Sequence, residues 1–138
     1  MTVHEWSGVR ILVVEDEWIL AMDIEATLLE AGYKVVGPLS NVRDALHAIE
    51  TEQVEAAVLD LNLQNETSLP VADALATRQT PFLFLSGHSA DLLPARHRSR
   101  VLVAKPWQST NLLREVGETL RRPADHRHDR SRTEDGPV

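Results

Sequence analysis

Residues 9–17 read Val-Arg-Ile-Leu-Val-Val-Glu-Asp-Glu, and residues 54–60 read Val-Glu-Ala-Ala-Val-Leu-Asp. Each stretch is a short apolar run with acidic residues at its end, and its length suits a buried strand. Such strands form parallel sheets with helices on both faces, and ligands bind in the crevice where the strand C-termini meet. We therefore expect the carboxylates of Glu15, Asp16 and Asp60 to converge in one pocket.

Carboxylates at that range repel each other, so either one is protonated or a cation holds them together. An oxygen-only cluster, without cysteine or paired histidines, suits a hard divalent ion such as Mg²⁺. Taken alone, residues 15–17 could equally be a solvated helix start, where acidic side chains favour the helix dipole. The lone Asp60 at a second strand end favours an acidic metal site built for phosphoryl chemistry.

Strand-like and helix-like segments alternate along the chain. Strands are predicted at 9–14, 34–38, 54–59, 81–85 and 101–104, and the second is expected to stop at Gly37-Pro38. Helices are predicted at 17–31, 42–51, 67–78 and 109–121, with a weak one at 89–97 that Pro94 interrupts. In the first helix, Ile19 and Leu29 belong to the predicted apolar stripe. Five alternations of this kind predict an α/β fold with a parallel sheet.

Bulk composition describes an ordinary globular domain of 138 residues, 43% hydrophobic and 25% charged. We interpret residues 1–8 as an N-terminal extension, 9–122 as the domain, and 123–138 as a disordered polar tail. A net charge of -7 argues against nucleic acid as a partner. Residues 1–6 lack the basic and apolar regions of a signal peptide, and the sequence contains no apolar run that could span a membrane, so we expect a cytoplasmic protein without a membrane partner.

Two further strand ends carry polar chemistry. The fourth predicted strand ends in Ser86-Gly87, a hydroxyl followed by a residue that permits close backbone approach, and the fifth ends in Lys105-Pro106. Phosphoryl transfer to a carboxylate needs a nucleophile, a cation that bridges it to the phosphoryl oxygens, and donors for the remaining oxygens. These residues, with the acidic cluster, supply that set.

The motifs in this order resemble the response-regulator receiver domain, the phospho-accepting half of two-component signalling, over roughly residues 9–121. The resemblance implies a doubly wound, flavodoxin-like (β/α)5 fold whose five-stranded parallel sheet has the strand order 2-1-3-4-5. It also implies a stand-alone regulator, not an enzyme beyond promoting its own phosphorylation and dephosphorylation, that is a monomer or weak dimer. Its expected partners are a sensor histidine kinase or phosphotransfer protein and a downstream protein target.

The resemblance also assigns roles to residues. Asp60 would accept the phosphoryl group, and Asp16 and Asp60 would bind Mg²⁺ (or Mn²⁺) directly. Glu15 would act on the metal through water, and Asn62 would offer its backbone carbonyl. The remaining matched positions would bind the phosphoryl oxygens and take part in the conformational switch; they are Ser86, Gly87 and Lys105. The peptide bond before Pro106 is expected to be cis.

Residues 81–88, Pro-Phe-Leu-Phe-Leu-Ser-Gly-His, are similar to the Pro-Phe-x-Phe-Ala-Thr-Gly-Tyr signature of some alphaproteobacterial single-domain receivers. His88 stands there as a rim residue that could influence how water reaches the phosphoryl group. Leu102 occupies the position at which many receivers carry a switching aromatic residue, and Trp107 takes the place of a common Phe and could pack beside the site. Because of these differences, we expect that this protein's output mechanism differs from that of many receivers.

Two other functions are compatible with parts of the pattern. A phosphatase of the haloacid dehalogenase class also uses a nucleophilic Asp and Mg²⁺, but it carries a second acid where this chain has Asn62, and it usually has a cap domain. A receiver-like scaffold that binds a partner without phosphorylation is the other alternative. The complete acidic set and Lys105 argue against the scaffold, whereas Leu102 and the loop at 64–68 favour it.

Overall fold

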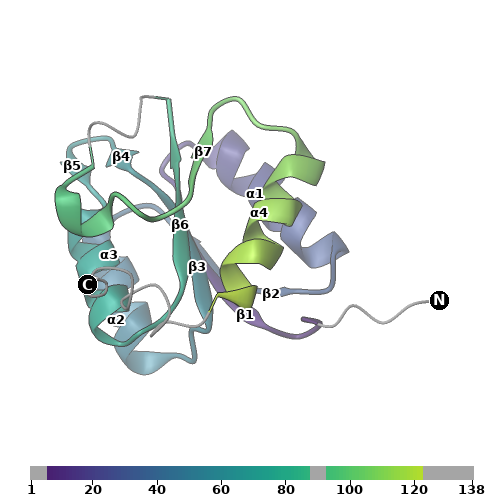
Figure 1. Ribbon diagram of the computed structural model, residues 1–138, viewed down its shortest axis with the longest axis horizontal. Coiled ribbons are helices and arrows are strands. Elements are labelled where there is room, and N and C mark those ends of the chain that lie inside the picture. Colours follow the sequence, from purple (N-terminus) through teal and green to yellow (C-terminus); the bar gives the residue numbers. More distant parts are fainter. Residues whose placement is uncertain (1–5, 88–92, 123–138) are drawn as a thin grey trace, which may run out of the picture.

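The computed structural model describes residues 6–87 and 93–122 (Figure 1). The predicted polar tail at 123–138, His88 and residues 89–92 of the weak helix at 89–97 lie outside the described residues. In its described part, the weak helix is only a short 3-10 helix, η2 (Ala95–His97), which begins after Pro94. Within the described residues, no helix is both long enough and apolar enough to cross a bilayer.

Five parallel strands form the central sheet in the order β2-β1-β3-β6-β7. Counted along the main sheet alone, this is the predicted order 2-1-3-4-5, so the predicted fold class is confirmed. The strands are β1 (Arg10–Val14), β2 (Lys34–Leu39), β3 (Ala56–Asp60), β6 (Phe82–Ser86) and β7 (Leu102–Ala104). In β3 and β6 every residue is buried, as a central strand covered on both faces requires.

Helices cover both faces of this sheet (Figure 1). They are α1 (Trp18–Glu30), α2 (Val42–Thr51), α3 (Leu69–Thr77) and α4 (Ser109–Arg121). Alternate residues of β1 enter two different cores, because successive side chains of a strand point to opposite faces. Leu12 and Val14 pack with α2 and α3, whereas Ile11 and Val13 pack with α1 and α4.

The second strand does not stop at Gly37-Pro38, so that boundary prediction was wrong. β2 continues to Leu39, and the backbone carbonyl of Leu39 accepts a hydrogen bond from the Glu15 amide at 2.9 Å. Proline is tolerated because β2 lies at the edge of the sheet, where one side of the strand needs no ladder donor. Gly37 has φ +101° and is followed by a cis peptide bond, at the point where the pairing with β1 shifts register.

The predicted apolar stripe of α1 was only partly correct. Ile24 and Leu28 are fully buried, but Ile19 is 67% exposed and Leu29 is 50% exposed. Trp18 and Met22 are exposed on the same helix. The arc of α1 that faces the sheet and α4 is narrower than its run of apolar residues, so part of that run lies on the surface.

A short hairpin that the sequence did not predict follows β3 directly. It consists of β4 (Asn62–Leu63) and β5 (Glu66–Thr67), which pair antiparallel. Leu63 is buried in the core, and the Glu66 carboxylate accepts a hydrogen bond from the Val42 amide at 2.9 Å. The loop at 64–68, in which the sequence departs from the receiver pattern, is therefore anchored to the start of α2.

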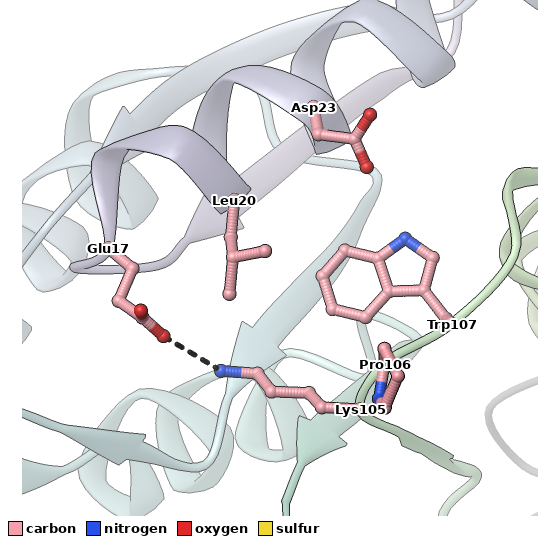
Figure 2. Close-up of a pocket in the computed structure, with 6 residues that line it drawn as sticks. All are labelled: Glu17, Leu20, Asp23, Lys105, Pro106 and Trp107. Carbon is pink, nitrogen blue, oxygen red and sulfur yellow. Dashed lines mark ion pairs between the residues drawn. The ribbon is translucent and has the colours of Figure 1, made fainter.

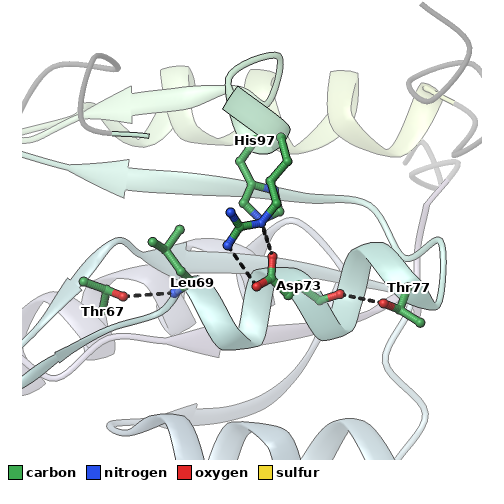
Figure 3. Close-up of polar contacts among 6 residues, drawn as sticks. Thr67, Leu69, Asp73, Thr77 and His97 are labelled. Carbon is green, nitrogen blue, oxygen red and sulfur yellow. Dashed lines mark hydrogen bonds and ion pairs between the residues drawn. The ribbon is translucent and has the colours of Figure 1, made fainter. Parts of the chain in front are cut away.

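The chain after β6 is fastened to α3 by Asp73 (Figure 3). The Asp73 carboxylate accepts two hydrogen bonds from Arg96, at 2.8 and 3.0 Å, and lies 2.7 Å from Nε2 of His97. His97, in the short 3-10 helix η2 (Ala95–His97), is 1% exposed and packs edge-on against Phe82 and Phe84. Burial lowers the pKa of His97, although the Asp73 carboxylate acts in the opposite direction.

Candidate functional site

The C-terminal edge of the sheet gathers the polar residues that the sequence singled out. Asp60 is the last residue of β3 and Ser86 the last residue of β6, and both are buried. Glu15 directly follows β1 and is 2% exposed, and Lys105 directly follows β7. The parallel topology alone brings these four positions to one edge, because every strand of the sheet runs in the same direction.

Lys105 is the centre of an ion-pair cluster at this edge. Its ammonium nitrogen lies 3.2 Å from Oδ2 of Asp60 and 3.3 Å from Oε1 of Glu15. A third carboxylate, that of Glu17, lies 3.9 Å away. Backbone amides hold the two buried acids in place: Asn62 donates to Oδ1 of Asp60 at 3.3 Å, and Glu17 donates to Oε2 of Glu15 at 3.1 Å.

Burial dominates the titration of the two buried acids. Desolvation, with the negative charge of Asp60 nearby, raises the pKa of Glu15 to about 7. Desolvation also raises the pKa of Asp60, although Glu15 and Lys105 oppose it by hydrogen bonding to the ionised carboxylate. Burial alone would lower the pKa of Lys105, but Asp60 and Glu15 outweigh it and raise the pKa. Bringing both acids into the charged form at this site is therefore unfavourable, and a cation in addition to Lys105 would relieve it.

The geometry of the acids suits such a cation. One carboxylate oxygen from each of Glu15, Asp16 and Asp60 lies within 4.8 Å of the others. Oε1 of Glu15 is buried and, among the described residues, receives no hydrogen bond of proper geometry. Hard oxygen ligands of this kind, with one partly exposed acid, fit a hard divalent ion such as Mg²⁺ or Mn²⁺ better than a metal that prefers nitrogen or sulfur ligands.

Among the other predicted residues that the structure describes, Ser86 and Pro106 lie next to this cluster in the chain, and Leu102 lies at the start of β7. The backbone carbonyl of Ser86 accepts a hydrogen bond from the Lys105 amide at 2.9 Å, which ties β6 to the start of the next loop. Gly87 is exposed, and a Cβ there would meet no described atom within 4 Å, so no close approach explains this glycine. Leu102 pairs with Phe84 and packs against the core. The Lys105-Pro106 bond is cis, as expected.

Sequence reasoning missed two parts of this region. Leu20 and Asp23 of α1, with Glu17, Pro106 and Trp107, form a pocket that shares Lys105 with the acidic cluster (Figure 2). The contact between Asp73 and His97 was also missed, because the two residues are 24 positions apart and follow no recognisable spacing. The sequence did single out Glu17, as the third member of the acidic triplet, and Trp107, as a residue that could pack beside the site.

The fold and this cluster define a phospho-acceptor domain of the receiver class, and comparison with known proteins agrees. The model of the response regulator receiver domain matches residues 11–116. This chain belongs to the response regulator receiver domain family. The family consists of signalling domains of two-component systems, not of classical enzymes, and membership does not favour a haloacid dehalogenase-type phosphatase or a phosphorylation-independent scaffold.

Several solved structures and curated proteins are similar to this chain. The solution structure of SdrG from Sphingomonas melonis is 38% identical, covers 82% of this chain and 97% of its own, and has a TM-score of 0.72. A second structure of SdrG, described as the BeF3-activated conformation, is 37% identical over 83% of this chain and 98% of its own, with a TM-score of 0.71. The phyllosphere-induced regulator PhyR of Methylorubrum extorquens is 30% identical over 80% of this chain and 43% of its own length. The chain spans about half the length of the curated relatives it matches.

Proposed function

We propose that this receiver domain accepts a phosphoryl group on Asp60 from a histidine kinase or phosphotransfer protein. The observation that carries the proposal is the convergence of a buried aspartate, two further acids and one lysine ammonium from three strand ends. A buried carboxylate faced by a fixed ammonium is prepared for a product that carries more negative charge than the reactant, because the positive charge is already in position.

In this proposal Asp60 is the nucleophile. A lone pair on its carboxylate forms the new O–P bond as the P–N bond of a phosphohistidine breaks, and the imidazole leaves with that electron pair, protonated on its other ring nitrogen. Lys105 lies 3.2 Å from the Asp60 carboxylate and would stabilise the added phosphoryl charge. The amide of Asn62, which donates to the other oxygen of Asp60, fixes the orientation of the nucleophile.

Glu15, Asp16 and Asp60 are the side chains that would hold Mg²⁺ (or Mn²⁺), and Asn62 would contribute its backbone carbonyl. When bound, the ion supplies a positive charge that neutralises the paired acids and offsets the charge of the phosphoryl oxygens. Two observations support this assignment: the three carboxylates cluster, and the buried Oε1 of Glu15 has an ion pair with Lys105 at 3.3 Å but no hydrogen bond among the described residues.

The response to phosphorylation would start at Ser86 and Gly87, beside the acceptor. Ser86 is fully buried and bonded through its carbonyl to the backbone of Lys105, so a movement at one residue reaches the other. Leu102 is not aromatic; it pairs with Phe84 in the sheet and packs against the core to which Phe84 belongs. We therefore propose that output comes from the segment after β6 rather than from rotation of an aromatic side chain on β7, and that it takes the form of contact with another protein or onward transfer of the phosphoryl group.

The test is phosphorylation by a small-molecule donor. The protein is incubated with Mg²⁺ and acetyl phosphate or phosphoramidate, and its intact mass is recorded beside Asp60→Asn. Asp23→Asn is the matched control, because Asp23 is an aspartate outside the acceptor cluster. One phosphoryl adduct is expected on the wild type and on Asp23→Asn, absent from Asp60→Asn and suppressed by chelator.

Beryllofluoride resolves a negative result, because it mimics the aspartyl phosphate without requiring transfer. Nuclear magnetic resonance shifts around Ser86 and Lys105 on its addition would show a site that holds the phosphorylated form. If neither an adduct nor such shifts occur, the proposed function is wrong and a scaffold role takes its place. An unchanged adduct on Asp60→Asn would refute the assignment of the nucleophile.

A further inference from the structure

A pocket of about 330 Å³ lies between the first half of α1 and the segment that follows β7 (Figure 2). Leu20, Pro106 and Trp107 give it apolar walls, and Glu17, Asp23 and Lys105 bring charged groups to it. Figure 2 shows the side chains of Glu17, Leu20 and Asp23 extending from the helix towards Lys105, Pro106 and Trp107. The volume is at the lower end for a ligand site and suits one long side chain rather than a large cofactor.

A ligand that enters this pocket would meet uncompensated negative charge. The Lys105 ammonium is already engaged by Asp60 and Glu15, at 3.2 and 3.3 Å. Glu17, whose side chain is 67% exposed, has its carboxylate at 3.9 Å from that ammonium and is only loosely paired. Asp23 is exposed and makes no hydrogen bond or ion pair with any described residue. Two carboxylates on one side of the pocket therefore lack a close cation of their own.

Trp107 adds a second feature that calls for a ligand. Its Nε1 is buried and has no acceptor among the described residues, although a buried indole N–H usually finds a partner. In Figure 2 the nitrogen lies on the edge of the ring that faces α1. A ligand with an acceptor oxygen close to a cationic group would satisfy this donor and the two carboxylates together.

We propose that this pocket binds the side chain of an arginine presented by a partner protein. The methylene groups would pack on Leu20 and Pro106, and the guanidinium would lie against the indole of Trp107 between the carboxylates of Glu17 and Asp23. Arginine fits better than lysine because a flat guanidinium stacks on an aromatic ring and also offers several donors to two acids at once. The carbonyl oxygen of the same residue is the acceptor available for Trp107 Nε1.

The inference is independent of phosphorylation at Asp60, although Lys105 is a wall that the two sites share. An arginine bound here would place a second cation next to Lys105, whose charge is balanced by Asp60 and Glu15. A partner docked through this contact would therefore lie beside the acceptor cluster. Whether that partner delivers the phosphoryl group or reads it does not change the chemistry of the contact.

The experiment is a titration of ¹⁵N-labelled protein with N-acetyl-arginine amide, monitored at the indole N–H resonance of Trp107. Trp107→Phe identifies that resonance among the three tryptophans of the chain. N-acetyl-citrulline amide is the matched probe, because it has nearly the same shape without the charge. A saturable shift is expected with the arginine probe at millimolar concentration and not with the citrulline probe.

Two variants locate the contact. Asp23→Asn is expected to weaken binding of the arginine probe about three- to fivefold, the range of an exposed ion pair. Glu30→Gln, a charge removal at the far end of α1, is expected to leave binding unchanged. No saturable shift, equal binding of citrulline, or equal binding by Asp23→Asn would each overturn the proposal. Phosphorylation by acetyl phosphate is measured on the same samples, so a failure of the pocket and a failure of the acceptor site give different results.

Discussion

Removal of the Glu15 charge is expected to stabilise the metal-free protein above neutral pH. Glu15 is 2% exposed, and burial together with the Asp60 charge raises its pKa from 4.5 to about 7. A group whose pKa is raised on folding contributes stability that is fully present when the pH is below its pKa in the unfolded chain. For Glu15 this contribution is lost as the pH rises from about 4.5, the unfolded pKa, to above 7, the folded pKa. At alkaline pH the folded state therefore carries a buried charge that unfolding would release to water.

The size of the effect follows from that difference. A change from 4.5 to about 7 corresponds to about 3 kcal/mol at 1.36 kcal/mol for each pH unit. Water reaches the cluster at Asp16, which is only partly buried, so screening reduces the expected gain to about 1–2 kcal/mol. Glutamine can still accept the hydrogen bond that the Glu17 amide donates to Glu15, and Lys105 keeps Asp60 as a counter-ion.

The measurement is urea unfolding of wild type and Glu15→Gln in the presence of chelator, at about pH 8 and about pH 5. We expect the variant to be more stable by about 1–2 kcal/mol at the higher pH and nearly equal at the lower pH. Glu17→Gln, at an exposed carboxylate, should change stability by less than about 0.5 kcal/mol. A Glu15→Gln protein less stable than wild type at about pH 8 would refute the reasoning. Added Mg²⁺ should reverse the order, because the variant loses a metal ligand.

Three further predictions concern Lys105, Gly37 and Asp73. Lys105→Met should slow adduct formation with acetyl phosphate at least about tenfold, because it removes the ammonium that lies 3.2 Å from Asp60. Intact-mass time courses measure this rate, and an unchanged rate would exclude a role of Lys105 in transfer. Gly37→Ala should destabilise by about 2 kcal/mol or more in thermal unfolding, because its Cβ would meet the Leu39 amide at 2.7 Å and φ is +101°; a smaller loss would mean that β2 adjusts freely. Asp73→Ala should cost about 2 kcal/mol by leaving buried His97 without its partner, whereas Asp73→Asn should cost less. The pKa of Asp73 is lowered from 3.8 by Arg96, so its contribution is present above that value and is lost as the pH falls through the lower folded pKa. The Asp73→Ala deficit should therefore shrink in strong acid, and a deficit that is the same at about pH 2 as at about pH 5 would contradict this.

The sequence by itself determined the five strands of the main sheet, the four helices that cover it, and their order. The runs before Glu15 and Asp60 are continuous and apolar because strands covered on both faces need no polar alternation, and this pattern is visible without a structure. The bounds of the helices at 42–51 and 109–121 were also correct, since their apolar stripes recur at helical spacing and Asn41 caps the first of them. Alternation of strand and helix then fixed the parallel topology, and with it the edge at which Lys105 meets Asp60.

Tertiary structure decided what depends on neighbours far away in the chain. Ile19 and Leu29 have the spacing of core residues but are exposed, because α4 and the sheet cover only one arc of α1. The strand through Gly37-Pro38 persists because it lies at an edge, a position that no local pattern reveals. The pairing of Asp73 with His97 and the placement of Asp23 and Trp107 around one pocket have the same origin. Each joins residues whose separation in sequence carries no periodic signal, so only the packing of one element on another brings them together.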